Sequence, residues 1–315
     1  MKFFIKILLT LSLFGFSASA HANDHINTVA DFAHIIDFES NRVLMSKNAD
    51  SPMKPASMAK IMTLYIVFSR IAEGTLTLED EFLVSEKAWK MGGSRSFLDV
   101  GTRVSVEELI NGIAVQSGND AAVVVAEGIS GSEEAFADEM NSFAQRLGMG
   151  DTNFTNSTGW PDEMLTTTAR DLSLLAAAII RDFPIDKFPN LYPVFAKPHH
   201  TYNNIKQPNR NPLIDRSPGA DGLKTGSTKE SGYGLVGSAE RNGQRIIIVL
   251  NGLESKKQRS LESNRLMDFM FRQYKKYNFF KSGETVKIAN VWLGKEPTIS
   301  MVLKEDLARV LSRKE

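Results

Sequence analysis

The sequence predicts an α/β protein in which an antiparallel sheet is assembled from both ends of the main domain and a helical lobe lies between them. Two short runs with strand character, 32–37 and 43–46, open the domain and are joined by a turn. A strong hairpin, 233–239 with 244–251, closes the domain around Asn242-Gly243. Mostly helical spacing separates the two pairs, so strands from both ends are expected to share one sheet.

The helices of the lobe are predicted from apolar residues three and four positions apart and from capping patterns. Ser105-Val-Glu-Glu108 and Thr168-Ala-Arg-Asp171 each place a hydroxyl three residues before an acid, which is typical of a helix start. Residues 183–219 are rich in Pro and Asn and are expected to form a long loop region with strand fragments. The predicted helices cover residues 57–72, 105–115, 120–129, 132–147, 168–182 and 257–274.

The composition is that of an ordinary globular protein with a sizeable core. Of the 315 residues, 42% are hydrophobic and 23% are charged, and the formal net charge is zero. A chain without an excess of basic residues gives no sign of a nucleic-acid partner. Cysteine is absent, which excludes a disulfide framework and thiol chemistry.

The N-terminus, residues 1–22, is predicted to be a secretory signal. Two lysines form a basic start, and the apolar run 7–16 is too short to span a bilayer. The preferred cut lies after Ala22, and an uncleaved anchor helix is the alternative. The main domain is then expected to cover 23–274. Residues 275–315 contain strand-like runs but are too few to form a stable core alone.

The stretch Pro55–Thr63 carries the first candidate for chemistry. Ser57 and Lys60 are three residues apart at the start of a predicted helix, so a hydroxyl and an amine share one face. A neutral lysine can take the proton of a serine and turn it into a nucleophile. Taken alone, such a pair is more often a helix cap beside a solvated lysine. Ser51-Pro52-Met53-Lys54 repeats the spacing, but its prolines exclude a helical turn.

Two further short patterns follow in the chain. Ser117-Gly118-Asn119 lies in a loop between two predicted helices and brings a hydroxyl and an amide to one point. Lys224-Thr225-Gly226 precedes the closing hairpin, where a strand edge can present N–H groups to an extended ligand. Each pattern is commonplace alone, but the three occur in this order, 60 and 107 residues apart. This set, with Ser-Asp-Asn as its middle motif, is the signature of class A β-lactamases and penicillin-binding proteins.

Around these motifs the chain resembles the serine-type D-alanyl-D-alanine carboxypeptidases, which are low-molecular-mass penicillin-binding proteins. The resemblance implies the α/β fold shared by penicillin-binding proteins and β-lactamases. Larger members continue into a full β-stranded second domain and an amphipathic membrane helix, whereas only the opening of such a domain is visible here. The apolar stripe 303–311 is expected to be a surface helix or a leftover strand. The matching stretches, within residues 30 to about 275, are Pro55–Thr63, Gln116–Asp120, Asn156–Gly159, Thr168–Leu172, Asn203–Asn211 and Asp221–Gly226.

The resemblance and the needs of acyl transfer imply the catalytic roles. Ser57 is the expected nucleophile and Lys60 its base, with a pKa lowered by burial and by the charge of Lys224. Ser117 is expected to relay a proton to the departing amine. The backbone N–H groups of Ser57 and Ser227 are expected to form the oxyanion hole.

The same reasoning implies the substrate-binding residues. Asn119 is expected to hold the substrate amide. Lys224 and Thr225, with Gly226 completing their motif, are expected to bind the terminal carboxylate of the substrate. Two arginines occupy positions where the family places arginines near that carboxylate, although a solvated surface arginine is the plain alternative. These two residues are Arg210 and Arg259.

The predicted enzyme is a periplasmic hydrolase that removes the terminal D-Ala from peptidoglycan stem peptides and is acylated by β-lactams. A D,D-endopeptidase that cuts cross-links and a non-catalytic peptidoglycan-binding remnant are the alternatives. No cofactor is expected, and His199-His200 does not suggest a metal because adjacent loop side chains rarely share an ion. Glu163 lacks the pattern that surrounds the deacylating glutamate of a β-lactamase. Peripheral contact with the inner membrane stays open, although the sequence shows no anchor helix.

Overall fold

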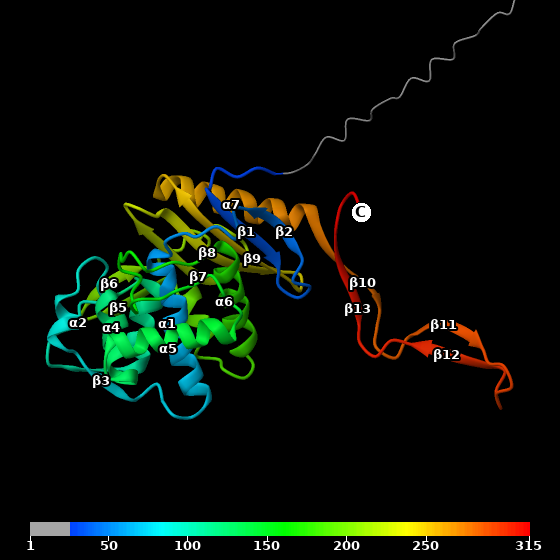
Figure 1. Ribbon diagram of the computed structural model, residues 1–315, viewed down its shortest axis with the longest axis horizontal. Coiled ribbons are helices and arrows are strands. Elements are labelled where there is room, and N and C mark those ends of the chain that lie inside the picture. Colours follow the sequence, from blue (N-terminus) through cyan, green and yellow to red (C-terminus); the bar gives the residue numbers. More distant parts are fainter. Residues whose placement is uncertain (1–25) are drawn as a thin grey trace, which may run out of the picture.

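A computed structural model describes residues 26–315, so the signal peptide predicted for residues 1–22 lies outside the described part of the chain. Its centre is a five-stranded antiparallel sheet in the order β2-β1-β9-β8-β7 (Figure 1). The strands are β1 (Phe32–Asp37), β2 (Val43–Lys47), β7 (Ala220–Thr228), β8 (Gly232–Arg241) and β9 (Gln244–Leu253). Because β1 pairs with β9, the predicted union of the two ends of the domain in one sheet is confirmed.

The central strands are apolar almost throughout because helices cover both faces of the sheet (Figure 1). Successive side chains of a strand point to opposite faces. Ile36 and Ile247 therefore pack with the helical lobe, whereas Ile35 and Ile248 pack against α7 (Lys256–Gln273). This two-sided burial holds the sheet rigidly between its layers.

The helical lobe is built around α1, in which every residue from Lys60 to Phe68 is buried. Its helices begin largely where the capping patterns predicted. The hydroxyls of Ser105 and Thr168 accept hydrogen bonds from the third backbone N–H that follows each residue. The helices are α1 (Lys60–Ala72), α2 (Glu86–Lys90), α3 (Val106–Val115), α4 (Asn119–Ser130), α5 (Glu133–Arg146) and α6 (Ala169–Asp182).

Short elements fill the connections. The 3₁₀ turn η1 precedes α1, and the 3₁₀ turn η2 follows α6. Two small hairpins, β3 with β4 and β5 with β6, lie outside the main sheet. Their bounds are η1 Ala56–Ala59, η2 Tyr192–Ala196, β3 Glu81–Leu83, β4 Arg103–Ser105, β5 His199–Tyr202 and β6 Ile205–Pro208.

The C-terminal residues form an arm that extends away from the main domain (Figure 1). Within it β10 (Tyr274–Phe280) pairs with β13 (Leu307–Ser312), and β11 (Thr285–Asn290) pairs with β12 (Thr298–Val302). The apolar stripe near the end is therefore a strand, one of the two forms expected. The arm touches the main domain where Arg42 donates a 2.6 Å hydrogen bond to the carbonyl oxygen of Val310.

Across residues 26–315, no helix has the length and apolar character needed to cross a membrane. The division into a main domain, 23–274, and the start of a second domain, 275–315, stays a prediction.

Candidate active site

The serine and lysine of the first motif lie at a change of helix type. The sequence predicted one helix from residue 57, but Ser57 belongs to the 3₁₀ turn η1, and the α-helix starts only at Lys60. Side chains three residues apart eclipse one another in a 3₁₀ turn. The Nζ atom of Lys60 is accordingly 3.1 Å from the Oγ atom of Ser57, within hydrogen-bond distance.

Two glycines let other motifs approach this turn from either side. A Cβ atom on Gly159 would lie 1.8 Å from the carbonyl oxygen of Ala56, and one on Gly226 would lie 2.8 Å from that of Pro55. Ala56 itself has a positive φ of 48°, which is uncommon for a residue with a side chain. The strained turn is thus clamped between two backbone segments that only glycine allows so close.

Lys60 is fully buried, and its amine is held by protein acceptors. Nζ donates to the Oδ1 atom of Asn119 at 2.6 Å and to the carbonyl oxygen of Thr158 at 2.5 Å. Burial, followed by the charge of Arg210, lowers the pKa of Lys60 to about 7. The predicted direction is right; Arg210 is the cation that adds to the effect of burial on Lys60, and the charge of Lys60 in turn lowers the pKa of Lys224. A lysine with this pKa is largely neutral above pH 7, so its lone pair can accept the proton of Ser57.

The Ser-x-Asn motif has two functions in the structure. The hydroxyl of Ser117 is buried, faces the catalytic pocket, and has no hydrogen-bond partner within residues 26–315. Asn119, expected to hold the substrate, bonds Lys60 through Oδ1 and donates from Nδ2 to the carbonyl oxygen of Gly92 at 2.8 Å. Asn119 therefore binds Lys60 and the loop that follows Met91, whereas the hydroxyl of Ser117 stays free, among the described residues, to meet another group in the pocket.

The loop that contains Gly92 and Gly93 supplies another pocket residue, Ser94. The buried carboxylate of Asp120 accepts from the backbone N–H of Ser96 at 2.7 and 2.9 Å, and the N–H of Asn119 donates to the carbonyl oxygen of Ser94 at 2.8 Å. Loop and motif are thus bonded to each other. In the sequence, the feature that indicates this contact is Asp120, an acidic residue directly after Asn119.

The catalytic pocket has a volume of about 330 Å³ and joins η1, the Ser117 loop, β7 and α7. Lys60, Asn119 and Lys224 lie buried behind its wall. Every charged side chain among the described residues that line it is a cation. The lining consists of Ser57, Ser94, Ser117, Arg210, Thr225, Gly226, Ser227, Lys256 and Arg259.

Arg259 is the buried cation of this pocket. It is 6% exposed, and its Nε atom has no partner within residues 26–315. Burial lowers its pKa to about 10. A buried guanidinium with a free donor is expected to bind an anion. Lys256 was missed by the sequence analysis, although its place three residues before Arg259 on α7 puts both on one helix face.

Lys224 and Arg210 are the other two cations that contribute positive charge to the site. Lys224 is 2% exposed and donates a 3.3 Å hydrogen bond to the carbonyl oxygen of Thr225. Burial and the charges of Lys60, Arg210 and Arg259 hold the pKa of Lys224 well below its usual value. The guanidinium of Arg210, exposed at the rim, bonds the hydroxyl of Ser94. The structure therefore brings both predicted arginines to the site.

Together, the sheet of two chain ends, the helical lobe and a serine beside a buried lysine define a serine enzyme of the penicillin-binding fold. Residues 17–255 match the family model described as D-alanyl-D-alanine carboxypeptidase. The chain belongs to this family, and the predicted resemblance and fold are confirmed.

Individual relatives are similar to this chain over most of its length. The D-alanyl-D-alanine carboxypeptidase DacF of Bacillus subtilis is 35% identical, with 98% of this chain and 80% of that protein covered. DacA of Escherichia coli K12 is also 35% identical, over 98% and 79%. The crystal structure of penicillin binding protein 5 from Haemophilus influenzae has a TM-score of 0.82 and 34% identity, covering 91% of this chain and 84% of that one. DacD from Francisella tularensis has the same TM-score at 30% identity, over 91% and 82%.

Proposed function

We propose that this serine hydrolase removes the terminal D-Ala from peptidoglycan stem peptides through an acyl-enzyme on Ser57. One observation carries the proposal: the Oγ atom of Ser57 lies 3.1 Å from the amine of a lysine whose pKa is lowered to about 7. The surrounding pocket offers hydroxyls and cations to a peptide that ends in a carboxylate. This combination suits acyl transfer from a free C-terminus.

The reaction follows from the positions of the side chains. Lys60 takes the hydroxyl proton of Ser57, and the serine oxygen attacks the carbonyl carbon of the penultimate D-Ala. The backbone N–H groups of Ser57 and Ser227 stabilise the oxyanion. The peptide C–N bond breaks when Ser117 passes a proton to the amine, and D-Ala departs. Water then attacks the ester, whose cleavage returns a proton to the serine oxygen and frees the shortened peptide.

The cations fix the direction of the substrate. The free carboxylate is bound by the hydroxyl of Thr225 and by the field of Lys224, Arg210 and Arg259. This preference suits a carboxypeptidase, whose substrate ends in the free carboxylate of the last D-Ala, and the cleavage assay below distinguishes it from a D,D-endopeptidase. A β-lactam presents a strained amide and a carboxylate in the same arrangement, so it acylates Ser57 as well.

Mass spectrometry after incubation with a penicillin tests the proposal directly. One adduct per chain is expected, on the peptide that contains Ser57, together with release of D-Ala from a stem pentapeptide. Labelling without D-Ala release, but with cleavage of cross-linked dimers, would favour the endopeptidase. A chain that binds peptidoglycan without an adduct or any cleavage would be the non-catalytic remnant.

We also propose that residues 1–22 direct export and that the enzyme works at the cell wall from the periplasm. The mature chain should then begin at Asn23, which N-terminal sequencing of the exported protein would show. Residues 23–274 form the catalytic domain in this proposal, and residues 275–315 open a β-rich second domain. Peripheral contact with the inner membrane belongs to the same proposal and predicts sedimentation of the mature chain with lipid vesicles.

A further inference from the structure

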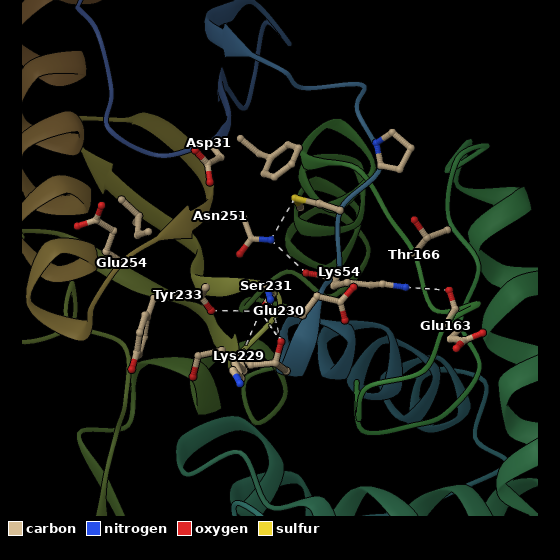
Figure 2. Close-up of a pocket in the computed structure, with 18 of the residues that line it drawn as sticks. Asp31, Lys54, Glu163, Thr166, Lys229, Glu230, Ser231, Tyr233, Asn251 and Glu254 are labelled. Carbon is tan, nitrogen blue, oxygen red and sulfur yellow. Dashed lines mark hydrogen bonds between the residues drawn. The ribbon is translucent and has the colours of Figure 1, made fainter.

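A groove of about 280 Å³ lies between α6 and the side of the sheet formed by β1 and β2. Among the described residues, it shares no lining residue with the catalytic pocket or with the larger pocket that adjoins the catalytic one, where Lys54 approaches Glu163 (Figure 2). β2 and β7 are the two edge strands of the sheet, so the groove lies at the edge opposite to the catalytic residues of β7. It is called here the α6 groove, and its lining includes His34, Ile36, Arg170, Ala177 and Arg181.

The α6 groove is elongated because it follows a helix and a strand. Arg170, Ala177 and Arg181 lie seven and four residues apart, so they share one face of α6. The two arginines are about 16 Å apart along the helix, and the small side chain of Ala177 leaves room between them. On the other side, His34 and Ile36 point to the same face of β1. The groove therefore has polar groups towards its ends and an apolar middle.

His34 carries an unused hydrogen-bond acceptor. The hydroxyl of Ser173 donates to the carbonyl oxygen of Arg170 at 2.7 Å, and its oxygen lies 2.8 Å from the Nδ1 atom of His34. Since a carbonyl can only accept, the hydroxyl proton is used there, and Nδ1 must donate its own proton to the hydroxyl oxygen. Burial, followed by the charge of Arg170, lowers the pKa of His34 to about 4, so near pH 7 the ring is neutral and Nε2 keeps a lone pair.

This lone pair is costly unless a donor meets it. His34 is 3% exposed, and its Nε2 atom has no partner within residues 26–315. A buried acceptor without a hydrogen bond destabilises the fold. The α6 groove thus offers a neutral acceptor at the end where His34 lies.

Arg181 is the cation towards the other end of the groove. It is exposed in the last turn of α6, its guanidinium carbon lies 5.6 Å from the centre of the Phe38 ring, and it forms no ion pair within residues 26–315. Arg170, in contrast, is neutralised by Asp50, whose two carboxylate oxygens both accept from it. The free positive charge of the groove is therefore that of Arg181, whose planar donors suit a carboxylate.

We propose that the α6 groove binds a small zwitterion of dipeptide size, with its carboxylate at Arg181 and its ammonium donating to Nε2 of His34. Ile36 and Ala177 contact the middle of this ligand, so small apolar side chains fit best. The volume of about 280 Å³ equals that of about nine water molecules at about 30 Å³ each, which is room for a dipeptide of alanines. The site is separate from the catalytic pocket and does not depend on the proposed reaction.

Calorimetric titration with the dipeptide L-Ala-L-Ala tests the proposal. Arg181→Gln should weaken binding about three- to tenfold, because it removes the charge that meets the carboxylate. The dipeptide with an amidated C-terminus should lose a similar factor on the wild-type enzyme and little more on the variant. Arg272→Gln makes the same change at an exposed position in the last turn of α7, on the other face of the sheet, and should leave the affinity unchanged.

The nitrogen NMR signal of His34 provides a second readout, which is assigned by its absence from His34→Phe. The Nε2 signal should shift when the dipeptide is added, because a donor then meets the lone pair. An unmoved signal, or equal affinities of the wild-type enzyme and Arg181→Gln, would overturn the proposal. Both titrations are repeated after incubation with a penicillin. Binding that disappears when Ser57 is acylated would place the dipeptide in the catalytic pocket and also overturn the α6 groove as its site.

Discussion

At the scale of single residues, the proposed acyl transfer depends on Lys60, a lysine whose pKa lies near neutral pH. Burial of Lys60 is the main cause of its lowered pKa, about 7, and the positive charge of Arg210 adds to the effect. The neutral form increases as the pH rises, so the kcat/KM of acylation should rise through pH 7 and level off above it. One unit below the pKa, about a tenth of the maximum should remain. A stopped-flow titration with a chromogenic β-lactam measures this profile.

Lys60→Arg tests the same base by removing its ability to lose a proton. A guanidinium stays protonated at every accessible pH, so acylation should fall about 10²–10⁴-fold and lose its rise near pH 7. Acylation at close to the wild-type rate would contradict the role of Lys60 as base.

Ser57→Ala should separate folding from chemistry. The hydroxyl of Ser57 meets Lys60, which keeps its acceptors on Asn119 and Thr158 when that hydroxyl is removed. The free energy of unfolding should therefore change by no more than about 1 kcal/mol. Penicillin labelling and D-Ala release should both disappear, which intact-mass and release assays measure. Labelling that persists in the variant would assign the nucleophile elsewhere.

The terminal carboxylate is expected to be recognised jointly by Lys224 and Arg259. Removing either partner of a desolvated charge pair costs about 2–5 kcal/mol, so Lys224→Ala and Arg259→Ala should each slow D-Ala release at least about tenfold. The loss should shrink on a peptide whose C-terminus is amidated, because that peptide offers no charge. An equal fractional loss of rate on the free and the amidated peptide would show that neither residue binds the carboxylate.

At the scale of elements, the catalytic turn depends on the glycine that packs against it. Gly159 and Gly131 both have positive φ values, 74° and 79°, but only a Cβ on Gly159 meets backbone atoms. Gly131→Ala should cost about 1–2 kcal/mol for the backbone alone. Gly159→Ala adds overpacking of about 1–3 kcal/mol or more and displaces η1, so penicillin labelling should also fall. Urea unfolding of the two variants measures the difference in their free energies of unfolding. Equal losses of stability and equal penicillin labelling would show that close packing of Gly159 does not hold η1 in place.

The elements predicted best were those whose signal is local. Ser105 and Thr168 cap α3 and α6 as their sequence pattern indicated, because capping involves only neighbouring residues. The start of α1 was placed wrongly, since the 3₁₀ form of η1 depends on glycines from distant segments that pack against it. α2 was missed because its five residues hold too little apolar periodicity to detect.

The same distinction between local signals and tertiary contacts applies to the candidate site. The motif residues were predicted from their order in the chain, but the bonds of Asn119 to Lys60 and Gly92 arise only when the loops pack together. Ser94 and Lys256 lie outside the three motifs and reach the pocket through tertiary contacts. Sequence patterns thus indicated which chemistry is present, whereas folding determines which partner each side chain finds.

At the scale of the whole molecule, the C-terminal arm is attached to the main domain by few contacts. Val310 is its buried apolar anchor, and Trp292 and Leu293 at the far hairpin are each 90% exposed. A chain ending at residue 274 should lose about 2–3 kcal/mol of stability, chiefly from Val310, and keep its rate of penicillin acylation. Thermal unfolding and labelling of the shortened chain provide the measurements. Loss of acylation in a folded variant would place residues 275–315 within the catalytic unit.

The pairing of β1 with β9, in which Phe32 faces Asn251, also constrains the order of assembly. A chain that is made, or crosses a membrane, N-terminus first delivers β1 long before its partner strand. Until β9 arrives, β1 lacks its partner on one edge, and the sheet cannot close. Non-local pairing of this kind slows folding, because a long loop must close before the contact can form. The five-stranded sheet therefore cannot be completed until nearly the last of its strands has emerged.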